Sequence, residues 1–209
     1  MLKYAHENGC PWNVRTCYAA ARGGHLRVLK YLHENGCPWD ESTCIQAAKG
    51  GHLDVLKYAH ENGCPWSVGW RADETCRAAA EGGHLEVLKY AHENGGPWNE
   101  GTCEAAARGG HLDVLKYAHE NGCPWDETTH VMACFYGHTN VKRWALAQGC
   151  PVFTTLEDLE WWFYDGDGLD EFDSDDACEG DSYDDSEDAW AERMNNLLDK
   201  LSTVLPIPW

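Results

Sequence analysis

The chain has 209 residues and a formal net charge of −19, of which residues 153–209 carry −16 through 18 Asp and Glu against 2 Lys and Arg. An acidic excess of this size argues against direct binding to nucleic acid or to an anionic membrane, because both need Lys and Arg to neutralise phosphate. No apolar run approaches the roughly 18 residues of a membrane span, and residues 1–7 lack the charged-then-apolar build of a signal peptide.

A repeated phrase organises the nearly neutral body of the chain, residues 1–152. Leu-Lys-Tyr-(Ala/Leu)-His-Glu-Asn-Gly begins at Leu2, Leu29, Leu56, Leu88 and Leu115, and an altered return of it spans 137–151. The step between copies is constant except from Leu56 to Leu88, where residues 67–74 contain a five-residue expansion. We divide this body into half a repeat at 1–12 and five repeats at 13–39, 40–66, 67–98, 99–125 and 126–152.

Each repeat predicts two helices. In repeat 40–66, Thr43 is the expected N-cap of a short helix rich in alanine, which ends at Gly50. A longer helix with apolar residues at helical spacing is predicted from His52 to Asn62. Gly63 supplies the expected left-handed C-cap, and a proline soon after it prevents continuation. Neither helix can bury its apolar face alone, so the pattern predicts stacked repeats in an all-α solenoid.

The second helix of each repeat carries a specific resemblance. Gly51-His52-Leu53-Asp54-Val55-Leu56-Lys57 resembles the Gly-His-Leu-Glu-Val-Val-Lys phrase of ankyrin repeats. The match recurs three more times and covers about three quarters of the chain. The wording His-Glu-Asn-Gly-Cys-Pro-Trp is similar to ankyrin arrays abundant in large DNA viruses and in protists. The resemblance implies an ankyrin-type solenoid that binds another protein.

The repeats depart from the ankyrin pattern in length. Ankyrin repeats usually have about 33 residues, and the resemblance places the missing six in the hairpin loop between repeats. Short binding fingers are therefore expected. Only segment 67–74 has the length of an ordinary finger, and it carries Trp70 and Arg71 as candidate partner-binding residues.

The two ends of the chain differ from the body. The half repeat at 1–12 lacks its inner helix, so we expect either that the chain is a fragment or that a partner covers this end. In the last repeat, Thr139 and Lys142 replace leucines, which makes its outward face polar, as expected for the repeat that caps the C-terminal end of the array. Residues 153–188 form an acidic, largely disordered linker by composition, and 189–205 an amphipathic helix that docks on the last repeat or on a partner.

Histidine, cysteine and tryptophan recur with the repeat. Zinc sites favour close pairs such as Cys-x2-Cys, which the sequence lacks, so His33, Cys37, Cys44 and His52 are interpreted as packing residues. We expect the tryptophans to pack against each other as a structural ladder. The eleven cysteines are an odd number that follows the repeat, which indicates a reducing cytosol or nucleus.

Catalysis and calcium binding have no specific motif. The sequence contains neither a phosphate loop nor a nucleophile elbow, and its candidate groups are copied in every repeat, whereas catalysis needs unique residues in one pocket. An EF-hand interpretation of residues 163–174 fails at both end ligands, Phe163 and Ser174. We predict no enzyme activity, no metal and no cofactor.

The positions that vary between repeats are the candidates for recognition. By resemblance to ankyrin proteins, the residues that end the first helix of each repeat face the concave surface. They are Arg22, Lys49, Glu81, Arg108, and finally Phe135 and Tyr136. A row that is mostly basic and closes with aromatic side chains suits an acidic partner segment. The chain's own acidic tail is a second ligand for it, which would make the tail autoinhibitory.

The leading hypothesis is a protein–protein interaction module, an adaptor or scaffold that binds an unidentified protein on its concave surface. One alternative is binding of basic proteins by the acidic tail, with the array as a scaffold. Another is a truncated or decaying array copy that has lost its function.

Overall fold

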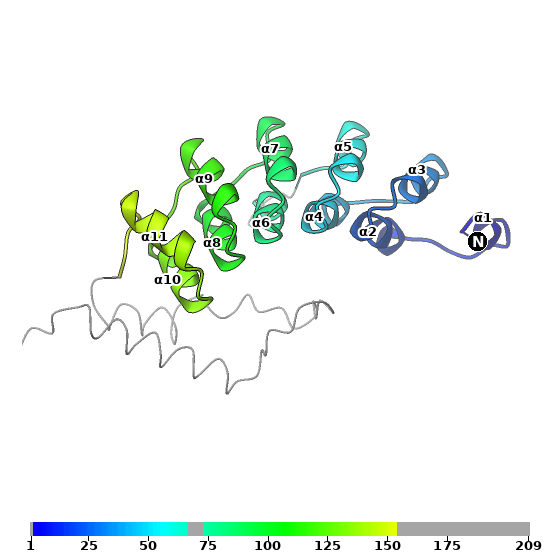
Figure 1. Cartoon of the computed structure of the whole chain (residues 1–209). Coiled ribbons are helices and arrows are strands. Elements are labelled where there is room, and N and C mark those ends of the chain that lie inside the picture. The colour runs from blue at the N-terminus through cyan, green and yellow to red at the C-terminus, as the bar shows by residue number, and fades with distance from the viewer. Residues whose placement is uncertain (1, 67–72, 154–209) are drawn as a thin grey trace, which may run out of the picture. The chain divides into compact units, whose positions relative to one another are not determined.

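A computed structural model describes residues 2–66 and 73–153, and the regular structure in these ranges is α-helical (Figure 1). Residues 1–150 form one compact unit, which we call the array, and residues 151–209 belong to a second. The inner helices are α2 (Val14–Arg22), α4 (Glu41–Lys49), α6 (Glu74–Glu81), α8 (Glu100–Arg108) and α10 (Glu127–Phe135). The outer helices are α1 (Leu2–Glu7), α3 (Leu26–Glu34), α5 (Leu53–Glu61), α7 (Leu85–Glu93), α9 (Leu112–Glu120) and α11 (Thr139–Ala147).

Some of the sequence predictions lie outside the described residues. These are the candidate finger residues Trp70 and Arg71, the acidic linker from residue 154 onward, the EF-hand-like segment and the helix predicted at 189–205.

Four of the five described inner helices begin at a side-chain cap, α6 being the exception, and the cap predicted for α4 was the wrong residue. The carboxylate of Asp40, and not the hydroxyl of Thr43, caps α4 by accepting a hydrogen bond from Ser42 N at 3.1 Å. Thr43 is instead completely buried. Asn13, Asn99 and Asp126 cap α2, α8 and α10 in the same way, which satisfies one of the free N–H groups at each helix start.

Outer helices end as predicted, at a glycine with left-handed backbone. Gly63 follows α5 with φ +85°, a conformation that costs glycine little because it has no Cβ. The preceding Asn62 donates from Nδ2 to Tyr58 O at 2.8 Å, and the same carbonyl accepts a bond from Asn62 N at 3.2 Å, so the asparagine binds the last turn of the helix through both its side chain and its backbone. The same asparagine bond recurs at the ends of α1, α3, α7 and α9.

The helices of the array stack in two rows. Each inner helix packs on the outer helix of its own repeat and on the neighbouring inner helices, and the inner row has the more extensive contacts (Figure 1). Small side chains make this close approach feasible, since Ala47 and Ala48 are completely buried in α4. The outer helix α5 buries Val55 and Leu56 against them, and removing such apolar side chains from water drives the stacking.

One histidine register joins each repeat to the preceding one through the backbone. His52 Nε2 donates to Arg22 O at 3.0 Å, and His84 Nε2 donates to Lys49 O at 3.0 Å. His111 and His138 make the equivalent bonds to Glu81 O and Arg108 O, at 2.9 and 2.8 Å. Each imidazole therefore satisfies the terminal carbonyl of the preceding inner helix.

The tryptophans that recur with the repeat do not pack against each other as predicted, although the last of them, Trp125, meets Trp144 of α11 edge-on at 5.8 Å. Trp39 stacks on His33 of its own repeat, with ring centroids 3.9 Å apart, and meets Tyr58 of the next repeat edge-on at 6.1 Å. His33 Nδ1 is also hydrogen-bonded to the Tyr58 hydroxyl at 3.0 Å. Neighbouring helices lie about 8–10 Å apart, which is too far for identical rings of successive repeats to stack face to face.

Candidate partner-binding surface

The candidate residues are brought into one row by the inner helices. Arg22, Lys49, Glu81, Arg108 and Phe135 are the last residues of α2, α4, α6, α8 and α10. We call these five residues the inner-end row. Because the histidine bonds fix the first four of these helix ends from repeat to repeat, the side chains emerge from equivalent backbone positions.

Exposure differs along the inner-end row. Arg22 and Glu81 are exposed, whereas Lys49, Arg108 and Phe135 are half-buried. The row therefore presents a free guanidinium and a carboxylate at two of its positions.

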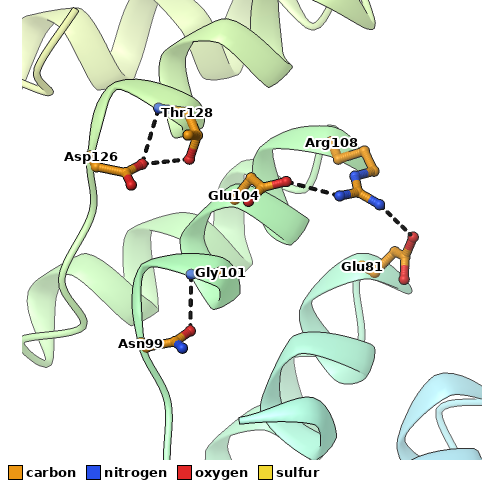
Figure 2. A network of polar contacts seen from close by, with 7 residues as sticks. All are labelled: Glu81, Asn99, Gly101, Glu104, Arg108, Asp126 and Thr128. Atoms are coloured by element: carbon orange, nitrogen blue, oxygen red, sulfur yellow. Dashed lines mark hydrogen bonds and ion pairs between the residues drawn. The ribbon is translucent and has the colours of Figure 1, made fainter. Parts of the chain in front are cut away.

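Arg108 is held by two carboxylates. Its Nη2 donates to Glu104 Oε1 at 2.8 Å within α8, and its Nη1 lies 3.7 Å from Glu81 Oε1 on α6 (Figure 2). Burial lowers the pKa of Arg108, but the charges of Glu104 and Glu81 outweigh it and the pKa is raised. The guanidinium stays protonated, and the carboxylates of Glu104 and Glu81 neutralise its charge within the array.

The C-terminal end of the row is aromatic. The rings of Phe135 and Tyr136 meet edge-on with centroids 5.1 Å apart, and Tyr136 lies parallel to the His138 ring at 6.4 Å. Tyr136 occupies the position where the four preceding repeats have glycine. The last repeat thus replaces a bare turn with a half-buried aromatic side chain.

The residues considered as zinc ligands are engaged separately. His33 stacks on Trp39, and His52 binds Arg22 O. Cys37 Sγ donates to Asn13 O at 3.4 Å. A hydrogen bond with Cys64 and burial both raise the pKa of the Cys44 thiol, so it stays protonated. Over the described ranges, no group of three or more His, Cys, Asp or Glu could hold a metal ion.

Three side chains beside the row were not predicted from the sequence. Glu104 is the principal partner of Arg108, a pairing that its spacing of four residues on one helix indicates. Tyr18 and Arg15 lie on α2, one and two turns before Arg22. Both positions vary between repeats, and this variation was the available signal.

Comparisons with known proteins agree with this geometry. Residues 17–60 match the family model of ankyrin repeats. The crystal structure of the human ASB11 ankyrin repeat domain is similar with a TM-score of 0.56 and 20% identity, over 64% of this chain and 69% of that chain. No curated protein matches the chain.

Ankyrin repeats are in general protein–protein interaction modules, and their fold is in general a noncatalytic scaffold. None of the described helices is long and apolar enough to cross a membrane. The stacked helix pairs, the match at residues 17–60 and the structural similarity together show that the described array has the fold of an ankyrin repeat solenoid.

Proposed function

We propose that the chain is an adaptor or scaffold that binds a partner protein along the inner-end row and the adjoining faces of the inner helices. The observation that carries this proposal is the contrast between two kinds of position. Side chains that join the repeats are nearly the same in each repeat, whereas the inner-end row reads Arg, Lys, Glu, Arg, Phe. Packing fixes the identity of the first set, whereas the identity of the second varies between repeats and can serve recognition.

The test is capture of partners from a cell lysate with charge-reversed full-length chains. Arg22→Glu with Lys49→Glu changes the inner-end row. Arg27→Glu with Lys57→Glu changes the net charge equally, at exposed positions of the outer helices α3 and α5. Arg108 is left intact, because reversing it would place three carboxylates together. A partner lost only from the first variant supports the proposal, and equal loss from both contradicts it.

A second function is favoured by composition. Residues 153–209 carry 18 Asp and Glu against 2 Lys and Arg, which suits binding of basic proteins by Coulomb attraction. A peptide of residues 153–209 that captures the same proteins as the full chain would favour this tail-centred role. A peptide that captures none of them would refute it.

The acidic tail also competes for the row in our proposal. Replacing its Asp and Glu by Asn and Gln in the full chain should strengthen partner binding, because the competing negative charge is gone. Unchanged affinity would rule out this autoinhibition. The described cysteines, which are free thiols, support placing the protein in a reducing cytosol or nucleus.

A further inference from the structure

The charge of the inner helices changes from one end of the array to the other. α2 carries two arginines and no acidic residue, and α4 balances one lysine with one glutamate. α6, α8 and α10 each carry one more acidic than basic residue. The inner helices are thus basic at α2 and mildly acidic from α6 onward.

The basic end is a compact cluster on one helix face. Arg15, Tyr18 and Arg22 follow each other at i, i+3 and i+7, which places them on one side of α2. Both arginines are exposed, and Tyr18 between them is half-buried. No carboxylate in the described ranges forms an ion pair with Arg15 or Arg22. We call these three residues the α2 cluster.

Arg108, farther along the inner-end row, is a weaker binding site for an acidic ligand than the α2 cluster. The Arg108 guanidinium already contacts Glu104 and Glu81, so an incoming carboxylate must displace one of them and meet the other. Like charges brought together in this way oppose binding. The two arginines of α2 keep their full capacity to form paired hydrogen bonds to carboxylates.

We propose that the α2 cluster recognises the acidic end of an extended partner segment whose other end is uncharged and apolar. This inference rests on the proposed function, and it specifies the charge distribution of the partner segment and its orientation along the array. Inner helices about 8–10 Å apart place α10 roughly 32–40 Å from α2, and an extended chain of about 12 residues covers that length. The apolar end would then reach Phe135 and Tyr136.

The test uses two fluorescein-labelled dodecapeptides of identical composition. One has four glutamates at one end and leucine and phenylalanine at the other, and the second has the same glutamates interleaved. Their binding to the full chain is followed by fluorescence anisotropy at physiological salt. We expect the segregated peptide to bind at least about 5-fold more tightly, because only it matches the charge gradient.

Matched variants locate the contact. Arg15→Glu with Arg22→Glu should weaken binding of the segregated peptide at least about 10-fold, because two charge-assisted contacts are lost and the new carboxylates repel its glutamates. Arg27→Glu with Lys57→Glu, which makes the same change of net charge on the outer helices, should stay within about 2-fold because exposed charges away from the contact are screened.

The outcomes separate this inference from the proposed function. Unchanged binding to the α2 variant, with loss in Lys49→Glu, would overturn the inference and leave the inner-end row as the binding surface. Equal loss in both double variants would overturn both. Binding that appears only when the acidic residues of 154–209 are neutralised supports the α2 cluster and identifies that segment as its competitor. No binding in any of these proteins overturns the inference.

Discussion

Two glycines of the second repeat share a left-handed backbone but have different surroundings. Gly51 has φ +70° and Gly63 has φ +85°. A Cβ on Gly51 would lie 2.5 Å from His84 Nδ1, whereas a Cβ on Gly63 would meet no atom within 4 Å. The first glycine thus makes room for the histidine of the next repeat, and the second serves only the turn.

Replacing each of these glycines by alanine should separate the two roles. Gly63→Ala should cost about 1 kcal/mol of unfolding free energy, the cost of a left-handed non-glycine residue. Gly51→Ala should cost about 2 kcal/mol more, because it also displaces the imidazole from Lys49 O. Urea unfolding measures both. In a His84→Ala background the difference should vanish, and a difference that persists would contradict this interpretation.

A threonine register contains hydroxyls that the fold leaves unsatisfied. Among the described residues, the Oγ1 atoms of Thr43, Thr102 and Thr129 are buried without a hydrogen-bond partner. Thr16, at the same position of the first repeat, instead accepts a bond from Asn13 N at 3.3 Å in a capping box.

Thr102→Val should therefore stabilise the array by about 1 kcal/mol, because it removes an unpaired buried hydroxyl and nearly keeps the shape. Thr16→Val should destabilise it by about 1 kcal/mol through loss of the cap bond. Thermal and urea unfolding of the two variants would test whether their changes in unfolding free energy have opposite signs. Destabilisation by both would mean that the Thr102 hydroxyl has a partner.

At the scale of the helix, α10 carries a titratable group where the other inner helices carry cysteine. His130 occupies the position of Cys17, Cys44, Cys76 and Cys103 and is 6% exposed. Burial, with a smaller contribution from Lys142, lowers the pKa of His130 to about 4. The folded protein thus holds this imidazole neutral at pH values where the unfolded chain protonates it.

This shift makes stability depend on pH with a defined sign. Above the unfolded pKa of about 6.5 the contribution is fully present, and it is lost as the pH falls toward 4, for a total of about 3 kcal/mol. His130→Cys removes the titration and restores the residue of the other repeats. Urea unfolding between pH 7 and 4 should show a smaller loss of stability in this variant. Parallel losses in the two proteins would contradict a neutral buried imidazole.

The helices themselves were largely predictable from the sequence. Apolar spacing and the glycine after Asn62 located α5 to within a residue at each end. The start of α4 was not predictable from the sequence, because both Asp40 and Thr43 are residue types that cap helices well. Stacking against the neighbouring repeats buries Thr43 and leaves Asp40 as the cap. The Trp39–His33 stack was missed because the period of the sequence shows that a tryptophan recurs in each repeat, but it does not give the distance between the tryptophans of successive repeats.

At the scale of the whole array, the repeat predicted the architecture, and the charge pattern of its surface required the structure. A nearly identical phrase that returns at a constant short step leaves few folds other than a solenoid. The pairing of Arg108 with Glu81 joins residues from different repeats, and it depends on side-chain conformations that no spacing rule specifies. The candidate row was therefore proposed from the sequence and stays a prediction, while the pairing of its Arg108 with two carboxylates required the structure.

The one irregular spacing also bears on the whole array. The longer interval between α5 and α7 leaves the junction unchanged, because His84 Nε2 reaches Lys49 O at 3.0 Å, as His52 reaches Arg22 O across an interval of the usual length. Stacking thus does not need the five extra residues.

Deletion of residues 68–72 should accordingly leave the array folded. It restores the usual interval and brings Ser67 three residues before Thr75, the position of the cap Asp40 relative to Thr43. We expect an unfolding free energy that is unchanged or raised by up to about 1 kcal/mol, from a shorter loop and a new cap. Replacing Trp70 and Arg71 by serine, at constant length, is the control. A loss of more than about 2 kcal/mol on deletion would mean that the extra residues pack on the array, whereas unchanged stability would leave Trp70 and Arg71 available for recognition.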